Sequence, residues 1–158
     1  MELVLAVPAV VAVLFAVAVG LAHRGERRRR GGWEALGAAR GWRYDAGDAT
    51  GAGVALRGTV DRTLSTVHRG VPVAVLSVRT VLDTGRDSYR VDVVEPVGVA
   101  RLPGLGAAPA VAGHRSWLAG ELLVVQPPRR WRRVQTTPRA EEAERVMAAL
   151  VAAVDAAR

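Results

Sequence analysis

The first feature of the chain is an unbroken apolar run from Leu3 to Ala22, which contains no charged side chain. As a helix, a run of this length spans about 30 Å and matches the hydrocarbon core of a bilayer. Pro8 lies near the start of the run, and membrane helices tolerate proline. A buried core helix is another interpretation, but a run of 20 residues that is apolar on every side disfavours it. The pattern therefore predicts a transmembrane anchor over residues 1–22.

A cleaved signal peptide is the alternative interpretation of this run. Such a peptide has a basic start, a shorter apolar stretch and a cleavage site of small residues. Here the run follows Met1 and Glu2, and the cleavage-like Ala16-Val17-Ala18 lies inside it. These features favour the anchor over the signal peptide.

A basic juxtamembrane segment, residues 23–32, follows the run. It contains Glu26 and five arginines, Arg24, Arg27, Arg28, Arg29 and Arg30. Since basic residues flank membrane helices on the cytoplasmic side, we expect a single-pass protein of the cell membrane. Its N-terminus would lie outside and residues 33–158 in the cytoplasm. The arginines could contact anionic lipid, at about 1 kcal/mol each, or act only as a topology signal.

The apolar pattern changes to a period of two from Val60 onward, which predicts β-strands. The expected strands are 60–68, 71–82, 88–94, 97–102, 115–118 and 121–126, with turns at 69–70, 83–87 and 119–120. Such short connections favour an antiparallel sheet. Residues 71–82 are apolar on both faces at their start, as in a covered central strand. Residues 45–58 are expected to form a loop, or a weak strand at 54–56.

Two helices are expected around this sheet. Residues 33–40 predict a short helix that ends at Gly41. The last helix has Thr137 as its cap and Pro138 in its first position. One apolar stripe on it faces the sheet: Ala143, Val146, Met147, Leu150 and Val154. The sequence thus predicts an α+β domain at 33–158, with an N-terminal transmembrane helix, an antiparallel sheet, a short N-terminal helix and a C-terminal amphipathic helix.

Composition excludes several kinds of chemistry. The chain has no cysteine and no lysine, which rules out disulfide scaffolds, thiolate zinc sites, Walker A loops and Schiff-base enzymes. All 22 basic residues are arginine, and the absence of lysine, asparagine and isoleucine indicates a GC-rich genome. The net charge of +7 is concentrated in two clusters of +4, so the rest of the chain is nearly neutral. This distribution disfavours a general nucleic-acid binder.

The second basic cluster follows Pro127-Pro128 and combines four arginines with an aromatic residue: Arg129, Arg130, Trp131, Arg132 and Arg133. It is a possible binding patch for the anionic inner leaflet, for nucleic acid or for an acidic protein surface. It is otherwise a solvated loop. Membrane contact is favoured among the binding partners because the anchor would already hold the domain at the lipid surface.

No catalytic, cofactor or metal site is predicted. His23, His68 and His114 lack the spacing of metal ligands. Ser65 with His68, or His114 with Ser116, could belong to a hydrolase, but the nucleophile elbow G-x-S-x-G is absent. We therefore expect a membrane-anchored, non-catalytic module that binds a partner protein or the anionic inner membrane surface. The alternative is a membrane-tethered, hydrolase-like enzyme.

Three short motifs accompany this layout: Leu36-Gly37-Ala38-Ala39-Arg40-Gly41-Trp42, Leu102-Pro103-Gly104-Leu105 and Gly120-Glu121-Leu122-Leu123-Val124. With the anchor, the basic stretch and the closing helix, the chain resembles a group of uncharacterised actinobacterial single-pass membrane proteins. The chain is shorter than such proteins between Pro109 and His114. The resemblance implies a cytoplasmic α+β domain behind a membrane anchor and implies no known activity.

Overall fold

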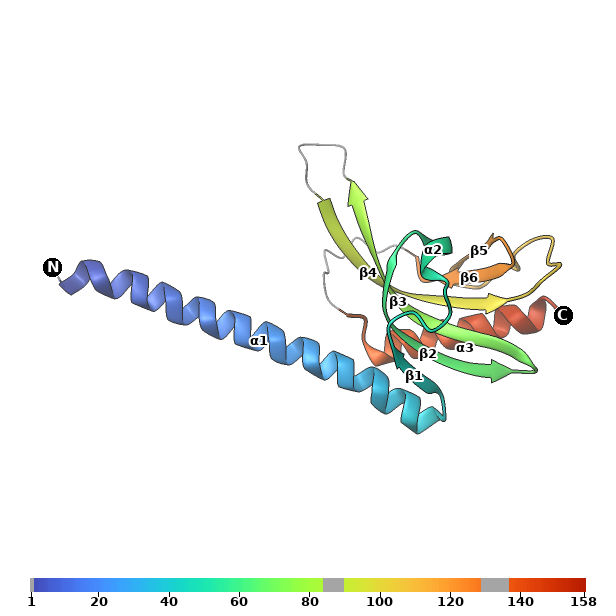
Figure 1. Cartoon of the computed structure of the whole chain (residues 1–158), viewed down its shortest axis with the longest axis horizontal. Helices are drawn as coiled ribbons and strands as arrows, with labels where there is room; N and C mark the ends of the chain where they lie inside the picture. Colours follow the sequence, from blue (N-terminus) through green and yellow to red (C-terminus); the bar gives the residue numbers. More distant parts are fainter. Residues whose placement is uncertain (1, 84–89, 129–136) are drawn as a thin grey trace.

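The computed structural model describes the backbone of residues 2–83, 90–128 and 137–158, and the side chains of residues 10–81, 93–128 and 137–158. Within these residues the chain has an α+β fold, a six-stranded antiparallel sheet with a helix at each end (Figure 1). The elements are α1 (Glu2–Arg40), β1 (Arg43–Ala46), α2 (Gly53–Leu56), β2 (Thr59–His68), β3 (Val71–Asp83), β4 (Arg90–Arg101), β5 (Arg115–Ala119), β6 (Leu122–Gln126) and α3 (Ala140–Ala156). The predicted fold class is confirmed at this level.

The sheet has the strand order β1-β2-β3-β4-β6-β5, and every neighbouring pair is antiparallel. The predicted turn at Arg69-Gly70 is confirmed, with φ values of 48° and 78°. Positive φ at both residues suits the right-handed twist of the β2–β3 hairpin. Strand β4 continues without a break through Pro96, which pairs with Ser77. Most of the predicted loop at 83–87 lies outside the described residues.

Strand β3 is covered on both faces, as its sequence predicts. Val71, Val73 and Val75 belong to a buried cluster that includes α3. Ala74 and Leu76 point the other way, because side chains alternate along a strand. They belong to a second cluster, which also includes Ala52 beside α2 and is packed against Trp117 of β5. The centre of the sheet therefore separates two apolar layers.

Helix α3 packs on the first layer through the predicted stripe, and all five of its side chains are buried: Ala143, Val146, Met147, Leu150 and Val154. The approach is close because Gly98 of β4 has no side chain there. A Cβ atom at Gly98 would lie 3.1 Å from Cγ1 of Val146.

The predicted start of this last helix is wrong. Its N-cap is Arg139, whose backbone N–H donates to the Glu142 carboxylate at 3.0 Å. Thr137 and Pro138 precede the helix and bind α1 instead.

Helix α1 corrects a further prediction. Residues 33–40 are not a separate short helix, because α1 is continuous over 39 residues and includes both these residues and the basic segment at 23–32. Each glycine in a helix interior reduces the stability of the helix by about 1 kcal/mol relative to alanine. The Gly31-Gly32 pair lies between Arg29 and Trp33, whose contacts with the domain offset this loss. Gly41, with φ of 66°, ends the helix as predicted. The weak strand expected at 54–56 is also wrong, because these residues form α2.

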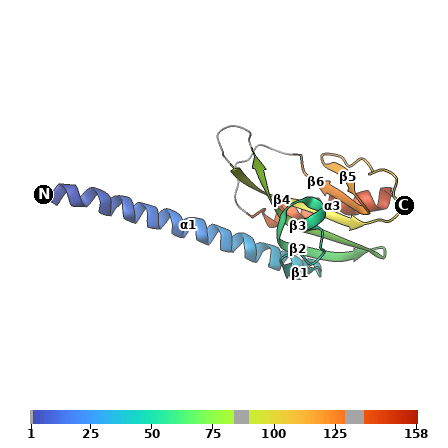
Figure 2. The same ribbon diagram turned by 45° about the horizontal axis from the view of Figure 1, so that its top comes forward.

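The N-terminal part of α1 projects away from the domain in both views (Figure 1 and Figure 2). From Val10 to Arg24 every side chain is exposed. Among the residues with described side chains, none of the helices is apolar over a length sufficient to cross a membrane. Residues 3–9 of the predicted anchor lie outside the described side chains.

Candidate functional site

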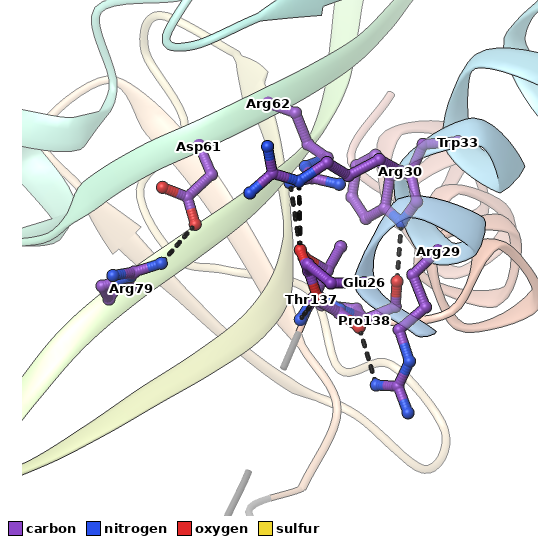
Figure 3. Close-up of polar contacts among 9 residues, drawn as sticks. All are labelled: Glu26, Arg29, Arg30, Trp33, Asp61, Arg62, Arg79, Thr137 and Pro138. Atoms are coloured by element: carbon purple, nitrogen blue, oxygen red, sulfur yellow. Dashed lines mark hydrogen bonds and ion pairs between the residues drawn. The ribbon is translucent and has the colours of Figure 1, made fainter. Parts of the chain in front are cut away.

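The polar contacts that join α1 to the domain form the candidate site, which we name the docking junction. It consists of Glu26, Arg29, Arg30, Trp33, Arg62, Thr137 and Pro138 (Figure 3). Residues 26, 29, 30 and 33 share one side of α1, because positions three, four and seven apart align on a helix. Arg62 lies on β2, and Thr137 and Pro138 immediately precede Arg139, the N-cap of α3. The junction thus joins three segments that are far apart in sequence.

Trp33 is the apolar centre of the junction. Its side chain is fully buried, and its indole N–H donates to the carbonyl oxygen of Pro138 at 2.8 Å. Close packing continues along the same side of α1. A Cβ atom at Gly32 would touch Cβ of Ala140 at 3.6 Å, and one at Gly37 would approach Leu64 at 3.0 Å. The small residues let the helix lie directly on α3 and β2.

Glu26 is the acidic centre of the junction. Its carboxylate accepts hydrogen bonds from the hydroxyl of Thr137 and, at 3.3 Å, from Arg30. Partial burial raises the pKa of Glu26, but the bonds from Thr137 and Arg30 and the charge of Arg62 outweigh it, so this pKa lies below its ordinary value. Glu26 is therefore held as a carboxylate at neutral pH.

Arg62 supplies a buried positive charge at 3.7 Å from the Glu26 carboxylate. The residue is only 3% exposed, and its Nε and Nη1 atoms have no hydrogen-bond partner among the described residues. Burial lowers the pKa of Arg62, while Tyr44 and Glu26 act in the opposite direction. A guanidinium stays protonated in proteins, so Glu26 balances a charge that water does not reach.

A pH titration tests the role of Glu26. A carboxyl group whose pKa is lowered on folding stabilises the fold above its ordinary pKa, and this contribution is lost as pH falls through the folded value. Glu26→Gln should therefore reduce the free energy of unfolding by about 1–3 kcal/mol at neutral pH. The difference in unfolding free energy between the variant and the wild type should shrink below pH 4.5, the ordinary pKa of this group. Urea unfolding of both chains over this pH range measures the gap.

Asp48 and Asp155 also have lowered pKa values, but both proteins in the comparison carry them. Their contributions therefore cancel in the difference. A gap that stays constant down to pH values well below 4.5 would contradict the assigned role of the Glu26 charge.

The junction divides the five arginines predicted to flank the membrane. Arg29 donates to the carbonyl oxygen of Thr137 at 3.0 Å, and Arg30 pairs with Glu26. Arg24, Arg27 and Arg28 are exposed and belong to no contact of the junction. The second predicted cluster, Arg129, Arg130, Trp131, Arg132 and Arg133, lies outside the described residues. The structure thus gives two of the five juxtamembrane arginines a structural role.

The serine–histidine pairs considered in the sequence are not brought together as dyads. Ser65 and His68 are three residues apart on β2, so their side chains point to opposite faces of the sheet. His68 instead pairs with Asp155 of α3 at 2.8 Å. The Ser116 hydroxyl donates to the carbonyl oxygen of Pro109, and the His114 ring contacts that of Ala112. Within the described residues, no cluster of three His, Asp or Glu side chains could hold a metal ion.

A hollow of about 830 Å³ adjoins the junction. Its lining mixes both signs of charge: Arg29, Glu95, Arg139, Glu141, Glu142, Glu144 and Arg145. This mixture favours neither an anionic nor a cationic ligand.

Glu26 and Arg62 were missed by sequence reasoning. One signal was present for each: Glu26 is the lone acid in a run of arginines, and Arg62 stands two residues from Leu64 in a half-buried strand.

Comparison with family models, with curated proteins and with solved structures finds no match to this chain. The resemblance to actinobacterial membrane proteins stays a prediction.

Proposed function

We propose that this chain is a membrane-anchored, non-catalytic module whose domain is held at the inner surface of the cell membrane by α1. The domain binds a partner protein or the anionic lipid surface there. One observation carries this proposal. The helix that packs into the domain through the docking junction continues as a free helix covered with apolar side chains.

The apolar side chains on the exposed part of α1 favour an apolar environment around the helix, such as the interior of a bilayer. Eight large apolar side chains between Val10 and Leu21 are between 51% and 71% exposed. They lie on all sides of the helix, because every residue from 10 to 24 is exposed. Burying apolar surface yields about 25 cal/mol for each Å² removed from water. A bilayer would bury all sides of this helix at once, whereas a single protein partner covers one side.

The distribution of charge supports the orientation. The apolar run is preceded by Glu2 without any arginine and is followed by five arginines within eight residues. Positive residues favour the cytoplasmic side. Residues 23–158 are therefore proposed to be cytoplasmic, as in the membrane proteins that the sequence resembles.

The enzyme alternative has less support. A Ser/His hydrolase needs its nucleophile and base within hydrogen-bond reach. Ser65 and His68 point to opposite faces of β2, and His68 is engaged by Asp155. The polar residues that do converge, at the docking junction, bind the helix to the domain.

Topology can be measured with reporters fused after Arg158. A reporter active only in the cytoplasm should be active, and one active only outside it should be silent. Alkaline extraction should leave the protein in the membrane fraction. Replacing Val13 and Val17 with arginine should release it, because each charge at the helix centre costs about 2.5–3.5 kcal/mol.

A matched control replaces two exposed alanines of α3, Ala152 and Ala156, with arginine, and should leave the protein in the membrane. An extracellular reporter signal would overturn the orientation. A mature chain that begins near residue 20 would show that the run is a signal peptide.

A further inference from the structure

We propose that Arg24, Arg27 and Arg28 form a binding stripe for the anionic headgroups of lipids, on the side of α1 opposite the docking junction. This inference rests on the proposed membrane anchor and deepens it. It names the partner, and it separates the arginines that bind lipid from the arginines that bind the domain.

The geometry of α1 places these three side chains together. Successive residues of a helix are rotated by about 100°. Arg24 and Arg28 therefore lie opposite Glu26, and Arg27 lies about a quarter turn away from it. All three are exposed, whereas Glu26, Arg29 and Trp33 contact the domain. The domain thus occupies one side of the helix and leaves the arginine stripe open.

The charge of the stripe is uncompensated. Glu26 is the only acid in residues 23–33, and its carboxylate is directed at Arg30, Arg62 and Thr137 (Figure 3). Within the described part of the chain, Arg24, Arg27 and Arg28 make no hydrogen bond or ion pair. Three guanidinium groups without a countercharge favour an anionic partner.

The position of the stripe identifies that partner as lipid. Arg24 and Arg28 follow Ala22 by about 3 Å and 9 Å along the helix axis. The headgroup layer of a bilayer is roughly 5–8 Å thick on each side, and arginine side chains are long enough to reach back into it. Phosphate and guanidinium form paired hydrogen bonds. A soluble acidic protein would have to enter the layer that headgroups already fill.

The experiment measures lipid selectivity of the full chain. The protein is reconstituted into vesicles of phosphatidylcholine, alone or mixed with phosphatidylglycerol. Spin-labelled forms of each lipid then report which lipid is held against the protein. The wild type should prefer phosphatidylglycerol, at up to about fivefold for each arginine near the surface. Salt should weaken the preference, because exposed charges are screened.

Two matched variants separate the sides of α1. Glutamine at Arg24, Arg27 and Arg28 should lower the preference for phosphatidylglycerol severalfold, and lysine at the same positions should keep most of it. Glutamine at Arg29 and Arg30 should leave the preference largely unchanged while weakening the docking of α1. Residues 129–133 are the same in all variants, so differences between variants report α1.

Three other results would contradict the proposal. An unchanged preference in the triple glutamine variant would leave these arginines as a topology signal only. Equal losses in the triple and double variants would show that total charge, and not the side of the helix, determines lipid binding. Absence of protein-bound lipid in both kinds of vesicle would overturn the membrane anchor itself, and the stripe with it.

Discussion

Replacing Leu150 with aspartate is expected to unfold the domain or leave it barely stable. Leu150 is fully buried between α3 and the sheet and lies against Gly98. Removing a buried leucine side chain costs about 2–5 kcal/mol, and a buried carboxylate without a partner adds several more. The total approaches the whole stability of an ordinary domain, about 5–15 kcal/mol. Urea unfolding of the full chain in mild detergent, followed by circular dichroism, measures the loss.

Glu144→Gln provides the matched control on the same helix. Glu144 forms an ion pair with Arg40, and both side chains are substantially exposed. Exposed pairs contribute about 0–1 kcal/mol, so the control should remain folded. Similar losses in the two variants would mean that the packing face of α3 is assigned wrongly.

Trp33→Ala is expected to detach α1 from the domain while the sheet stays folded. The change removes the largest fully buried side chain of the junction and leaves the Pro138 carbonyl without its donor. Truncating a buried tryptophan costs about 3–5 kcal/mol. The core cluster of the sheet and α3 keeps most of its members, so the loss should be local. Hydrogen exchange should accelerate in residues 26–40 more than in β3.

Two further variants test this explanation. Trp33→Phe keeps most of the ring but removes the N–H donor, so its effect should fall between those of alanine and the wild type. Glu34→Ala changes the next residue, which is exposed, and should alter stability by less than about 0.5 kcal/mol. Uniform acceleration of exchange throughout the sheet in Trp33→Ala would show that α1 is an integral part of the core.

Local periodicity was sufficient to predict β2, β3, β5, β6 and the packing face of α3, but it did not predict β1. The stripe from Ala143 to Val154 repeats with the period of a helix, and β3 carries apolar residues on both faces. Short connections such as Arg69-Gly70 then fix antiparallel neighbours. These features depend on residues within a few positions of one another, and the sequence displays them directly.

The docking junction could not be predicted in this way. Thr137 is an ordinary capping residue by its position before a helix, yet its hydroxyl bonds Glu26, which is 111 residues away. The same contact explains why the helix begins two residues later than expected. Arg62 is a charged residue at a buried position of β2. The carboxylate that pairs with it is Glu26 of α1, which is far away in sequence, so the pair cannot be read from local periodicity. The continuity of α1 through Gly31 and Gly32 was equally hidden in the sequence, because Gly32 packs against Ala140, which is far away along the chain.

The continuity of α1 from the apolar run to Arg40 has a mechanical consequence. Membrane helices tilt by about 20° on average, and the tilt depends on bilayer thickness. The stretch from Ala22 to Arg40 extends about 27 Å, so such a tilt moves its far end sideways by roughly 9 Å. If α1 is anchored in a membrane as proposed, the domain cannot stay in place while the helix tilts, because α1 has no break that could act as a hinge. In a membrane, the attachments at Trp33 and between Arg40 and Glu144 would convert a change of bilayer thickness into a swing of the whole domain over the lipid surface.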